Sequence, residues 1–438
     1  MSKLALLGGP KAVPEHDEEM FHWPRVTPEM EEAVLAVLRS GDMSGIGITR
    51  EFEKKFAAWM GVKYALASPN GTGALQEAMF AVGVGMNCEL ICPSLTYWAS
   101  CLPAVALGAR VVFADVEPDT LCLDPASFES HITPRTRAVV VVHYLGHPAD
   151  MDPIMEIARK HGIKVIEDVS HAQGGLYKGR KLGTIGDVAA CSMMSGKSFS
   201  IGEGGMLYTD SKAVYEKALT FGHYERIGEI EDLKLPEGAG KLPWGGCKHR
   251  LNQIASAIGL CQLEKYERET AEIDRAMKYF RNGIKDIGGL RMHYPEKWEN
   301  STKAGWYEAK LFYDAQAFGG LSLTRFAEAL RAEGVRDAVC GCNTPLHHSA
   351  LFSRIDIYGG LGRPTANLFD ASDAAVPPGA LPVTEAANDR LLAVPPFRRF
   401  RPEVLDLYIA AYRKVASLHR ELLAEDRKEK AEGIFYHF

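Results

Sequence analysis

The sequence lacks any concentrated block of lysine and arginine. Its 438 residues carry 50 basic and 56 acidic side chains, with a formal net charge of −6, and a balance of this kind offers no electrostatic footprint to a polyanion. The short basic runs at 398–401 and 427–430 are expected to be solvated surface. We therefore expect no nucleic-acid partner.

Long apolar runs are also missing. No uninterrupted stretch approaches the ~20 residues that a membrane-spanning helix needs, so no membrane partner is expected. The apolar run at 4–9 is too short and glycine-rich for a secretory signal. The nine cysteines are odd in number and scattered, which favours reduced thiols and a cytoplasmic protein. Only Cys340 and Cys342 stand close together, and without a second pair we expect no metal site.

Length and composition indicate a two-domain globular protein. A chain of 438 residues exceeds what one hydrophobic core usually supports. Its 46% hydrophobic and 24% charged residues are an ordinary globular balance. A charged helical pattern from residue 262 to about residue 286 is expected to connect a first domain, residues 1–265, to a second, residues 266–438.

Short β-rich runs alternate with helical stretches in the first domain. The candidate strands are 63–68, 89–92, 110–114, 138–142, 164–167, 188–192 and 206–209. Because these runs are continuously apolar, they predict an α/β domain with a mostly parallel sheet covered by helices on both faces. The second domain mixes a strand at 309–313 with helices at 323–333 and 402–423. This mixture predicts a smaller α+β domain, with a glycine-rich surface loop at 358–379.

One lysine introduces chemistry. Lys197 precedes the run 202–205, Gly-Glu-Gly-Gly, and an amine buried in such a turn can form a Schiff base with an aldehyde. Asp168 follows the predicted strand 164–167, at the edge where α/β sheets bind ligands. A carboxylate there can keep a pyridine nitrogen protonated. The pair predicts a pyridoxal phosphate site, with a surface turn and a helix-capping aspartate as the alternatives.

Further residues supply what this cofactor requires. Gly71 and Thr72 lie where a predicted strand gives way to a helix, and helix N-terminal amides with a hydroxyl can bind phosphate. Tyr97, in the loop after the next strand, can stack on the ring. His171 can hydrogen-bond the ring oxygen. A ligand-free turn, core packing of the tyrosine and a satisfied buried imidazole remain the alternatives.

Together with Ser192, these residues form an ordered set along the chain, Gly71-Thr72, Tyr97, Asp168-x-x-His171, Ser192 and Lys197. The set resembles the fold-type I, pyridoxal phosphate-dependent aminotransferases of the DegT/DnrJ/StrS family, which make amino sugars and aminocyclitols. The resemblance covers nearly all of the chain, from 44–57 to 393–397. It implies a large cofactor-binding domain with a seven-stranded sheet and an N-terminal arm, followed by the smaller α+β domain.

The resemblance also implies roles. Lys197 would hold the cofactor in a Schiff base, or aldimine, and shuttle the proton between the substrate and coenzyme carbons. Asp168 would pair with the pyridine nitrogen and Tyr97 would stack on the ring. The phosphate would be held by Ser192 and the amides around residues 71 and 72.

Two positions depart from the common family pattern. His171 stands where many members carry glutamine, and Lys248 stands where many carry an asparagine that reaches the neighbouring subunit's phosphate. Both departures are found in relatives that aminate cyclitols or make an aminated benzoate. Lys248 would still serve a phosphate, with a structural ion pair as the alternative. Because that group crosses a subunit boundary, the resemblance implies a homodimer with two shared active sites.

The implied reaction is a ping-pong transfer of an amino group from L-glutamine or L-glutamate to a keto-cyclitol like scyllo-inosose, or to a keto-sugar. A nucleotide-linked keto-sugar aminotransferase and a 3-amino-5-hydroxybenzoate synthase-like enzyme remain alternatives. A non-catalytic pyridoxal phosphate-binding regulator would be expected to lose Asp168 or Lys197, and the family's dehydratases carry histidine in place of the lysine. A nucleotide-binding oxidoreductase needs a Gly-x-Gly-x-x-Gly turn, which 70–75 does not supply. Trp244 and the loop 344–348 are expected to line the substrate pocket.

Overall fold

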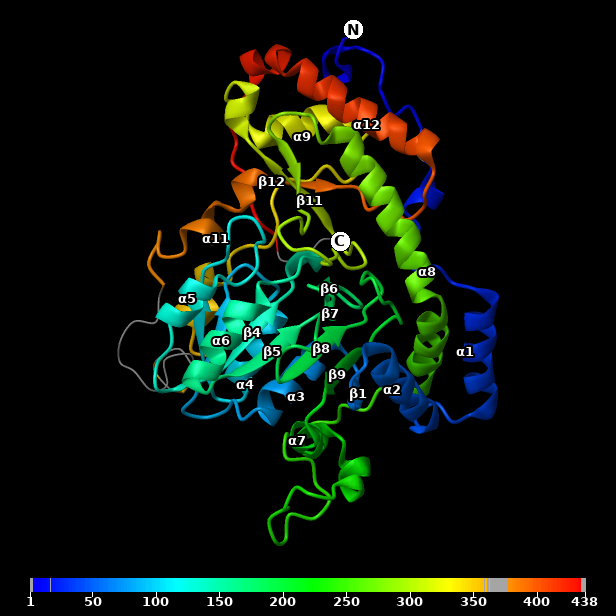
Figure 1. Ribbon diagram of the computed structural model, residues 1–438, viewed down its shortest axis with the longest axis vertical. Helices are drawn as coiled ribbons and strands as arrows, with labels where there is room; N and C mark the ends of the chain where they lie inside the picture. The colour runs from blue at the N-terminus through cyan, green and yellow to red at the C-terminus, as the bar shows by residue number, and fades with distance from the viewer. Residues whose placement is uncertain (1–2, 16, 358, 361, 363–375, 435–438) are drawn as a thin grey trace.

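A seven-stranded sheet forms the centre of the larger part of the molecule (Figure 1). The computed structural model describes residues 3–15, 17–357, 359–360, 362 and 376–434. The strands are β1 (Tyr64–Ser68), β2 (Glu89–Pro93), β3 (Arg110–Ala114), β4 (Thr136–Val142), β5 (Lys164–Asp168), β8 (Val188–Ser192) and β9 (Gly205–Thr209). All seven predicted strands are confirmed, each to within two residues at either end.

The strand order explains why chemistry gathers at one edge. The order is β1-β9-β8-β5-β4-β2-β3. Strand β9 pairs antiparallel with β1 and with β8, whereas the other pairings are parallel. The carboxyl ends of the six parallel strands and the amino end of β9 therefore meet at the same edge. The connector 193–204, which contains Lys197, lies over this edge because it joins β8 to β9.

Helices cover the sheet. Strands β2 and β9 are buried at every position, which requires cover on both faces, because neighbouring side chains of a strand point to opposite sides. The helices of this part are α1 (Pro28–Ser40), α2 (Gly47–Met60), α3 (Gly71–Ala81), α4 (Leu102–Ala106), α5 (Pro125–Ser130), α6 (Met151–His161) and α7 (Lys212–Gly222). A short hairpin, β6 (Leu176–Tyr177) with β7 (Arg180–Lys181), completes it.

A long helix joins the larger part to the smaller one. Helix α8 (Gln253–Ile284) spans 32 residues, lying against α1 and α2 at one end and against α12 at the other (Figure 1). It starts nine residues before the predicted position of 262, because the side chain of Asn252 caps it by accepting a hydrogen bond from the amide of Ala255 at 2.9 Å.

The smaller part is α+β, as predicted. Its antiparallel sheet has the order β10 (Leu290–Met292), β11 (Ala309–Tyr313) and β12 (Leu391–Val394). Its helices are α9 (Leu323–Ala332), α10 (Ala350–Ser353), α11 (Pro382–Ala386) and α12 (Pro402–Ser417). The last predicted helix ends earlier than residue 423 because the chain continues as the 3₁₀ helix η10 (His419–Glu425). Most of the predicted loop 358–379 lies outside the described residues.

The buried apolar side chains form two cores. One surrounds the seven-stranded sheet, and the other fills the space between the three-stranded sheet, α9, α12 and the end of α8. Leu4, Val13 and Met20 belong to this second core, so the N-terminal segment packs with the smaller part. The carboxylate of Glu333 holds it there by accepting hydrogen bonds from the amides of Ala5 and Ala12 at 2.8 and 3.0 Å. The domain boundary at residue 265 stays a prediction.

Candidate active site

A cavity of about 390 Å³ opens at the edge of the sheet where the parallel strands end. Such an edge is the usual ligand site of an open α/β sheet. The cavity brings together all of the predicted site residues except Lys248, namely Gly71, Thr72, Tyr97, Asp168, His171, Ser192 and Lys197. Lys248 is exposed and does not line the cavity of its own chain.

The start of α3 lines the cavity with groups that can bind an anion. Asn70 caps the helix by accepting a hydrogen bond from the amide of Gly73 at 2.8 Å. Gly71 and Thr72 line the cavity, and their amides, at the first two positions of the helix, have no acceptor within it. A Cβ atom added to Gly71 would lie 2.5 Å from the Cβ of Ser192. Only glycine permits this approach, which puts the serine hydroxyl beside the helix N-terminus and makes the group suited to a phosphate.

Ser192 is fixed through its backbone. Its amide donates to the hydroxyl of Ser170 at 3.0 Å, and its carbonyl accepts from the side-chain amide of Gln173 at 2.6 Å. The hydroxyl of Ser198 donates in turn to the side-chain oxygen of Gln173 at 2.7 Å. These bonds tie the end of β8 to the loop after β5, which places the anion site in a fixed relation to Asp168.

Asp168 is buried at the end of β5, with 4% of its surface exposed. One carboxylate oxygen accepts from the hydroxyl of Ser100 at 2.7 Å and the other from the amide of Ser170 at 3.1 Å. Thr96 lies 2.9 Å from Ser100 and extends the chain of hydroxyls. The carboxylate is therefore held in one orientation at the cavity wall, as a partner for a cationic ring nitrogen requires.

Lys197 supplies the amine. Burial lowers its pKa to about 8, against the opposing effects of Asp168 and Glu308, so roughly a tenth of the amine is neutral at pH 7, far more than for an ordinary lysine. Its Nζ lies 3.9 Å from the centre of the Tyr307 ring. The backbone carbonyl of Lys197 accepts a hydrogen bond from the indole of Trp23 at 2.9 Å. A neutral, positioned amine in a cavity is the requirement for attack on an aldehyde.

His171 stacks on the ring of Tyr307, with the ring centres 4.4 Å apart and an interplanar angle of 23°. Its pKa is well below the usual value because the ring is buried and because Lys197 and Lys303 are cationic neighbours. The Nδ1 atom accepts a hydrogen bond from the amide of Leu145 at 3.2 Å. The neutral ring therefore carries its proton on Nε2, which makes that atom a donor.

The smaller part contributes cavity residues that the sequence did not predict. Tyr307, Glu308 and Asn343 line the cavity, and the first two immediately precede β11. In the sequence, an aromatic residue before a strand gives no sign that it lines a cavity with residues more than a hundred positions earlier in the chain. The predicted pocket residue Trp244 is not among the cavity residues; its ring packs on Lys217 instead. The loop 344–348 likewise does not line the cavity, although Asn343, the residue just before it, does.

Lys303 supports the cavity from behind. Its Nζ donates to the carbonyl of Leu145 at 2.6 Å, and burial lowers its pKa to about 7. Leu145 has a φ of 54°, a left-handed conformation that is unusual for leucine. The hydrogen bond of the lysine helps to hold this conformation, which aims the Leu145 amide at His171.

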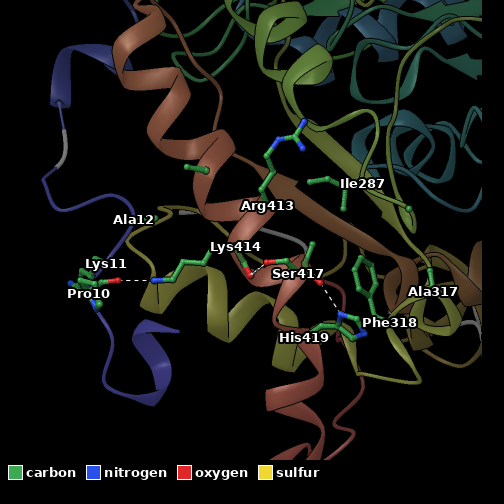
Figure 2. A pocket seen from close by; sticks show the side chains of 13 residues that line it. Pro10, Lys11, Ala12, Ile287, Ala317, Phe318, Arg413, Lys414, Ser417 and His419 are labelled. Atoms are coloured by element: carbon green, nitrogen blue, oxygen red, sulfur yellow. Dashed lines mark hydrogen bonds between the residues drawn. The ribbon is translucent and has the colours of Figure 1, made fainter. Parts of the chain in front are cut away.

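A larger hollow, of about 770 Å³, lies away from this edge, between the N-terminal segment and α12 (Figure 2). The described residues that line it include Arg413 and Lys414, but no carboxylate or thiol. Lys414 is engaged, since its Nζ donates to the carbonyl of Pro10 at 2.7 Å. The hydrogen bond of Lys414 holds the N-terminal segment against α12. The described residues that line this hollow do not combine an amine with a carboxylate, as those around Lys197 do.

Residues 24–367 match the model of the DegT/DnrJ/EryC1/StrS aminotransferase family. The chain belongs to this family. It is similar to a putative L-glutamine:3-amino-2,3-dideoxy-scyllo-inosose aminotransferase of Micromonospora echinospora, with 32% identity over 80% of this chain and 82% of the relative. The GDP-perosamine synthase of Caulobacter vibrioides is 36% identical over 69% of this chain and 78% of the relative.

Solved structures agree with the family assignment. The aminotransferase of Psychrobacter cryohalolentis superposes with a TM-score of 0.78 and 27% identity, covering 91% of this chain and 100% of that one. The similarity confirms the predicted fold class, and the chain is an aminotransferase. No helix within the described ranges is long and apolar enough to cross a membrane.

Proposed function

We propose that the chain is a pyridoxal phosphate-dependent aminotransferase that moves an amino group from L-glutamine or L-glutamate to a keto-cyclitol of the scyllo-inosose type. The observation that carries the proposal is the cavity at the sheet edge, where a buried amine of lowered pKa, an oriented carboxylate and an anion-binding helix terminus face one space. This set of groups fits pyridoxal phosphate. When bound, the cofactor supplies an electron sink for charge on the substrate carbon.

Each cavity residue would have a role that follows from its position. Lys197 would hold the cofactor and, when released, take and return the proton at the substrate carbon with its Nζ. Asp168 would accept a hydrogen bond from the ring nitrogen, in the orientation that Ser100 fixes. Nε2 of His171 would donate to the ring oxygen, and Tyr97 would stack on the ring face. The amides at 71 and 72, with Ser192, would bind the phosphate.

Donor and acceptor would use the cavity in turn. The amino donor would leave its nitrogen with the bound cofactor and depart as its keto acid before the keto acceptor enters, because the cofactor would carry one amino group at a time. This order gives ping-pong kinetics. Lys197, Asp168 and His171 are all buried, which would limit the access of water during the proton transfer.

The central test removes the amine. Lys197→Ala is expected to abolish steady-state transamination, because no other amine lines the cavity within the part of the chain that the structure describes. Lys217→Ala is the matched control: this lysine also has a lowered pKa and lies 4.5 Å from the ring centre of Trp244, but it stands outside the cavity. Retained turnover in Lys197→Ala would sink the assignment, as would equal losses in the two variants.

The keto-cyclitol acceptor is supported by the name of the Micromonospora relative and by His171 and Lys248, which the family resemblance links to cyclitol enzymes. Glu308 adds a carboxylate to the cavity wall, which suits the hydroxyl groups of a polyol better than a diphosphate. The Caulobacter relative, a GDP-perosamine synthase, favours a nucleotide-linked keto-sugar as the second candidate.

A panel of acceptors separates the two. The enzyme is first loaded with L-glutamine, and the absorbance of the aminated coenzyme is then followed after addition of scyllo-inosose, 2-deoxy-scyllo-inosose or a nucleotide-linked 4-keto-sugar. We expect the inososes to discharge the amine at least tenfold faster than the nucleotide sugar, a difference of about 1.4 kcal/mol in the barrier. Discharge by nucleotide sugars alone contradicts the cyclitol proposal and leaves the aminotransferase assignment intact.

The proposal includes a cytoplasmic homodimer. All nine cysteines are free thiols, which supports a reducing compartment. The exposed position of Lys248, outside the cavity of its own chain, supports a role in the site of a second copy. A C2 dimer would then contain two equivalent sites, each with residues from both chains.

A further inference from the structure

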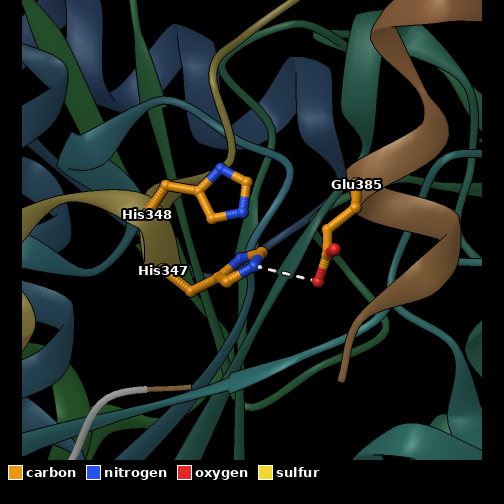
Figure 3. Close-up of side chains that lie close together, drawn as sticks. All are labelled: His347, His348 and Glu385. Carbon is orange, nitrogen blue, oxygen red and sulfur yellow. Dashed lines mark ion pairs between the residues drawn. The ribbon is translucent and has the colours of Figure 1, made fainter. Parts of the chain in front are cut away.

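Two histidines and a glutamate meet outside the cavity, on elements far apart in the sequence. His347 and His348 belong to the 3₁₀ helix η7 (Leu346–His348), and Glu385 belongs to α11. One nitrogen or carboxylate oxygen from each lies within 4.8 Å of the others, with Glu385 facing the His347 ring (Figure 3). We propose that these three side chains bind a divalent transition-metal ion of the zinc type.

The buried imidazole of His347 has a hydrogen bond at one nitrogen and, within the described part of the chain, none at the other. Its Nδ1 lies 2.6 Å from the hydroxyl of Ser94, and the same hydroxyl accepts a hydrogen bond from the backbone amide of His347 at 3.1 Å. Its Nε2 is buried and has no hydrogen-bond partner among the described residues. A histidine that binds a metal has this pattern, in which a second polar group orients the ring by contacting the other nitrogen.

The spacing between the ligands matches a shared metal better than a direct contact. Nε2 of His347 lies 3.4 Å from a carboxylate oxygen of Glu385. A hydrogen bond between nitrogen and oxygen has a usual length of about 2.9 Å. Two ligand atoms at ~2.0–2.1 Å from a tetrahedral zinc ion are roughly 3.3–3.4 Å apart. The observed distance therefore leaves room for the ion between them.

Glu385 is held in position before any ion arrives. Both of its carboxylate oxygens accept from the amide of Gly379 at 2.9 Å. The start of α11 is fixed by Asp115, which accepts from the amides of Val383 and Thr384 at 3.0 and 2.8 Å. The glutamate is therefore a preorganised ligand, as a metal site on a rigid element requires.

His348 completes the set from the surface. Its ring centre lies 4.2 Å from that of His347, and the residue is exposed, so its side chain can turn toward the ion without rearranging the core. Two imidazoles and one carboxylate are a common zinc ligand set, with water in the fourth position. An ion here would join η7 to α11 and, through Ser94, brace the loop that carries Tyr97.

The same contact has a competing explanation without metal, an ion pair between a protonated His347 and Glu385. A binding experiment distinguishes the two. Untagged, cofactor-loaded protein is stripped with a chelator and titrated with Zn²⁺ against a chromophoric chelator. We expect one Zn²⁺ per chain. His348→Asn and Glu385→Gln should each weaken binding at least tenfold, and neither change opens a cavity in the core.

His161→Asn is the matched control. His161 is also exposed and lies 3.5 Å from a carboxylate oxygen, that of Glu129, but it is not part of the triad. Its replacement should leave zinc binding unchanged. Zinc should raise the melting temperature of the unaltered protein and of His161→Asn, but not that of His348→Asn.

The absorption spectrum of bound Co²⁺ distinguishes histidine and carboxylate ligands from thiolates. Binding at the proposed site should produce the visible bands of a tetrahedral cobalt ion without a thiolate-to-metal charge-transfer band. Three results would overturn the proposal: the absence of stoichiometric zinc binding, equal zinc affinity in His348→Asn and the unaltered protein, and a thiolate charge-transfer band, which would assign the metal to cysteines instead.

Discussion

Tyr307 sets the environment of Lys197 from the second half of the chain. The His171 ring stacks on Tyr307 with 4.4 Å between ring centres, and the amine of Lys197 lies 3.9 Å from the centre of the same tyrosine ring. The ring is therefore one of the groups that bury the amine of Lys197, a residue that is 9% exposed. Since burial is the largest cause of the lowered pKa of Lys197, we expect this aromatic side chain to contribute to the reactivity of the proposed site.

Replacing Tyr307 with leucine is expected to admit water and to raise the pKa of Lys197 above 8, toward its ordinary value of 10.5. Only the neutral form of an amine is nucleophilic, so the rate at which apoenzyme takes up pyridoxal phosphate should rise with pH through about 8. In Tyr307→Leu the midpoint moves to higher pH, and uptake at pH 7.5 falls about tenfold for each unit of pKa.

Tyr307→Phe keeps the ring and is the control, since it should retain the midpoint of the unaltered protein. The absorbance of the bound cofactor, recorded against pH in stopped-flow mixing, measures all three proteins. An unchanged midpoint in the leucine variant would show that the ring does not shield the amine.

At the scale of single elements, the start of α3 is packed tightly against the end of β8. A Cβ atom at Gly71 would lie 2.5 Å from the Cβ of Ser192, so alanine there must displace the helix or the end of β8. We expect Gly71→Ala to weaken pyridoxal phosphate binding roughly 10- to 100-fold and to lower stability by about 1–3 kcal/mol. Titration of apoenzyme, followed by cofactor absorbance, measures the first effect, and thermal unfolding measures the second.

Gly47→Ala provides the matched control at the start of α2. The nearest atom to a Cβ atom there is an oxygen of Gln253 at 3.6 Å, an ordinary contact. This variant should bind the cofactor like the unaltered protein. If Gly71→Ala did the same, the close approach between α3 and β8 would have no part in binding the phosphate.

The sequence predicted elements well where a local pattern defines them. The runs that became β1 to β5, β8 and β9 are apolar and end at turn residues, so each could be located by itself. The reversed direction of β9 could not, because direction is decided by the neighbours β1 and β8. The early start of α8 was missed because residues 253–261 carry no charged side chain, and the pattern was read from the charged stretch that follows.

The site residues also fall into those that a local motif predicts and those that it does not. Gly71, Asp168 and Lys197 follow strands whose ends share one edge, so a motif in each loop was enough to place them. Tyr307 and Ser100 carry no motif. The first reaches the cavity only when the smaller part folds against the larger one, and the second is identified by its place in the cavity wall and its 2.7 Å bond to Asp168.

At the scale of the whole molecule, the exposed Lys248 predicts shared sites. If Lys248 serves the phosphate of the partner, each site takes Lys197 from one chain and Lys248 from the other. Lys197→Ala and Lys248→Ala then remove contributions that come from different chains. When the two variants are unfolded together and refolded as an equal mixture, half of the dimers combine one chain of each kind, and each of these has one intact site. We expect about a quarter of the unaltered activity to return.

Each variant refolded alone is the control and should remain nearly inactive at limiting cofactor. Activity is measured with L-glutamine as donor, and the molar mass of the mixture is checked by light scattering. A dimer whose mixed form stays inactive would contradict a shared site, and a monomer would contradict the homodimer itself.

The N-terminal segment gives the molecule a mechanical property. Leu4, Val13 and Met20 anchor it in the core of the smaller part, and Trp23 fastens it to the backbone carbonyl of Lys197 at the edge of the larger sheet. The segment is thus a tether between the two halves, attached at one end to the main chain of Lys197. A rotation of the smaller part would pull on that main chain, so any such movement would be coupled to the reach of the amine through a link outside the cavity.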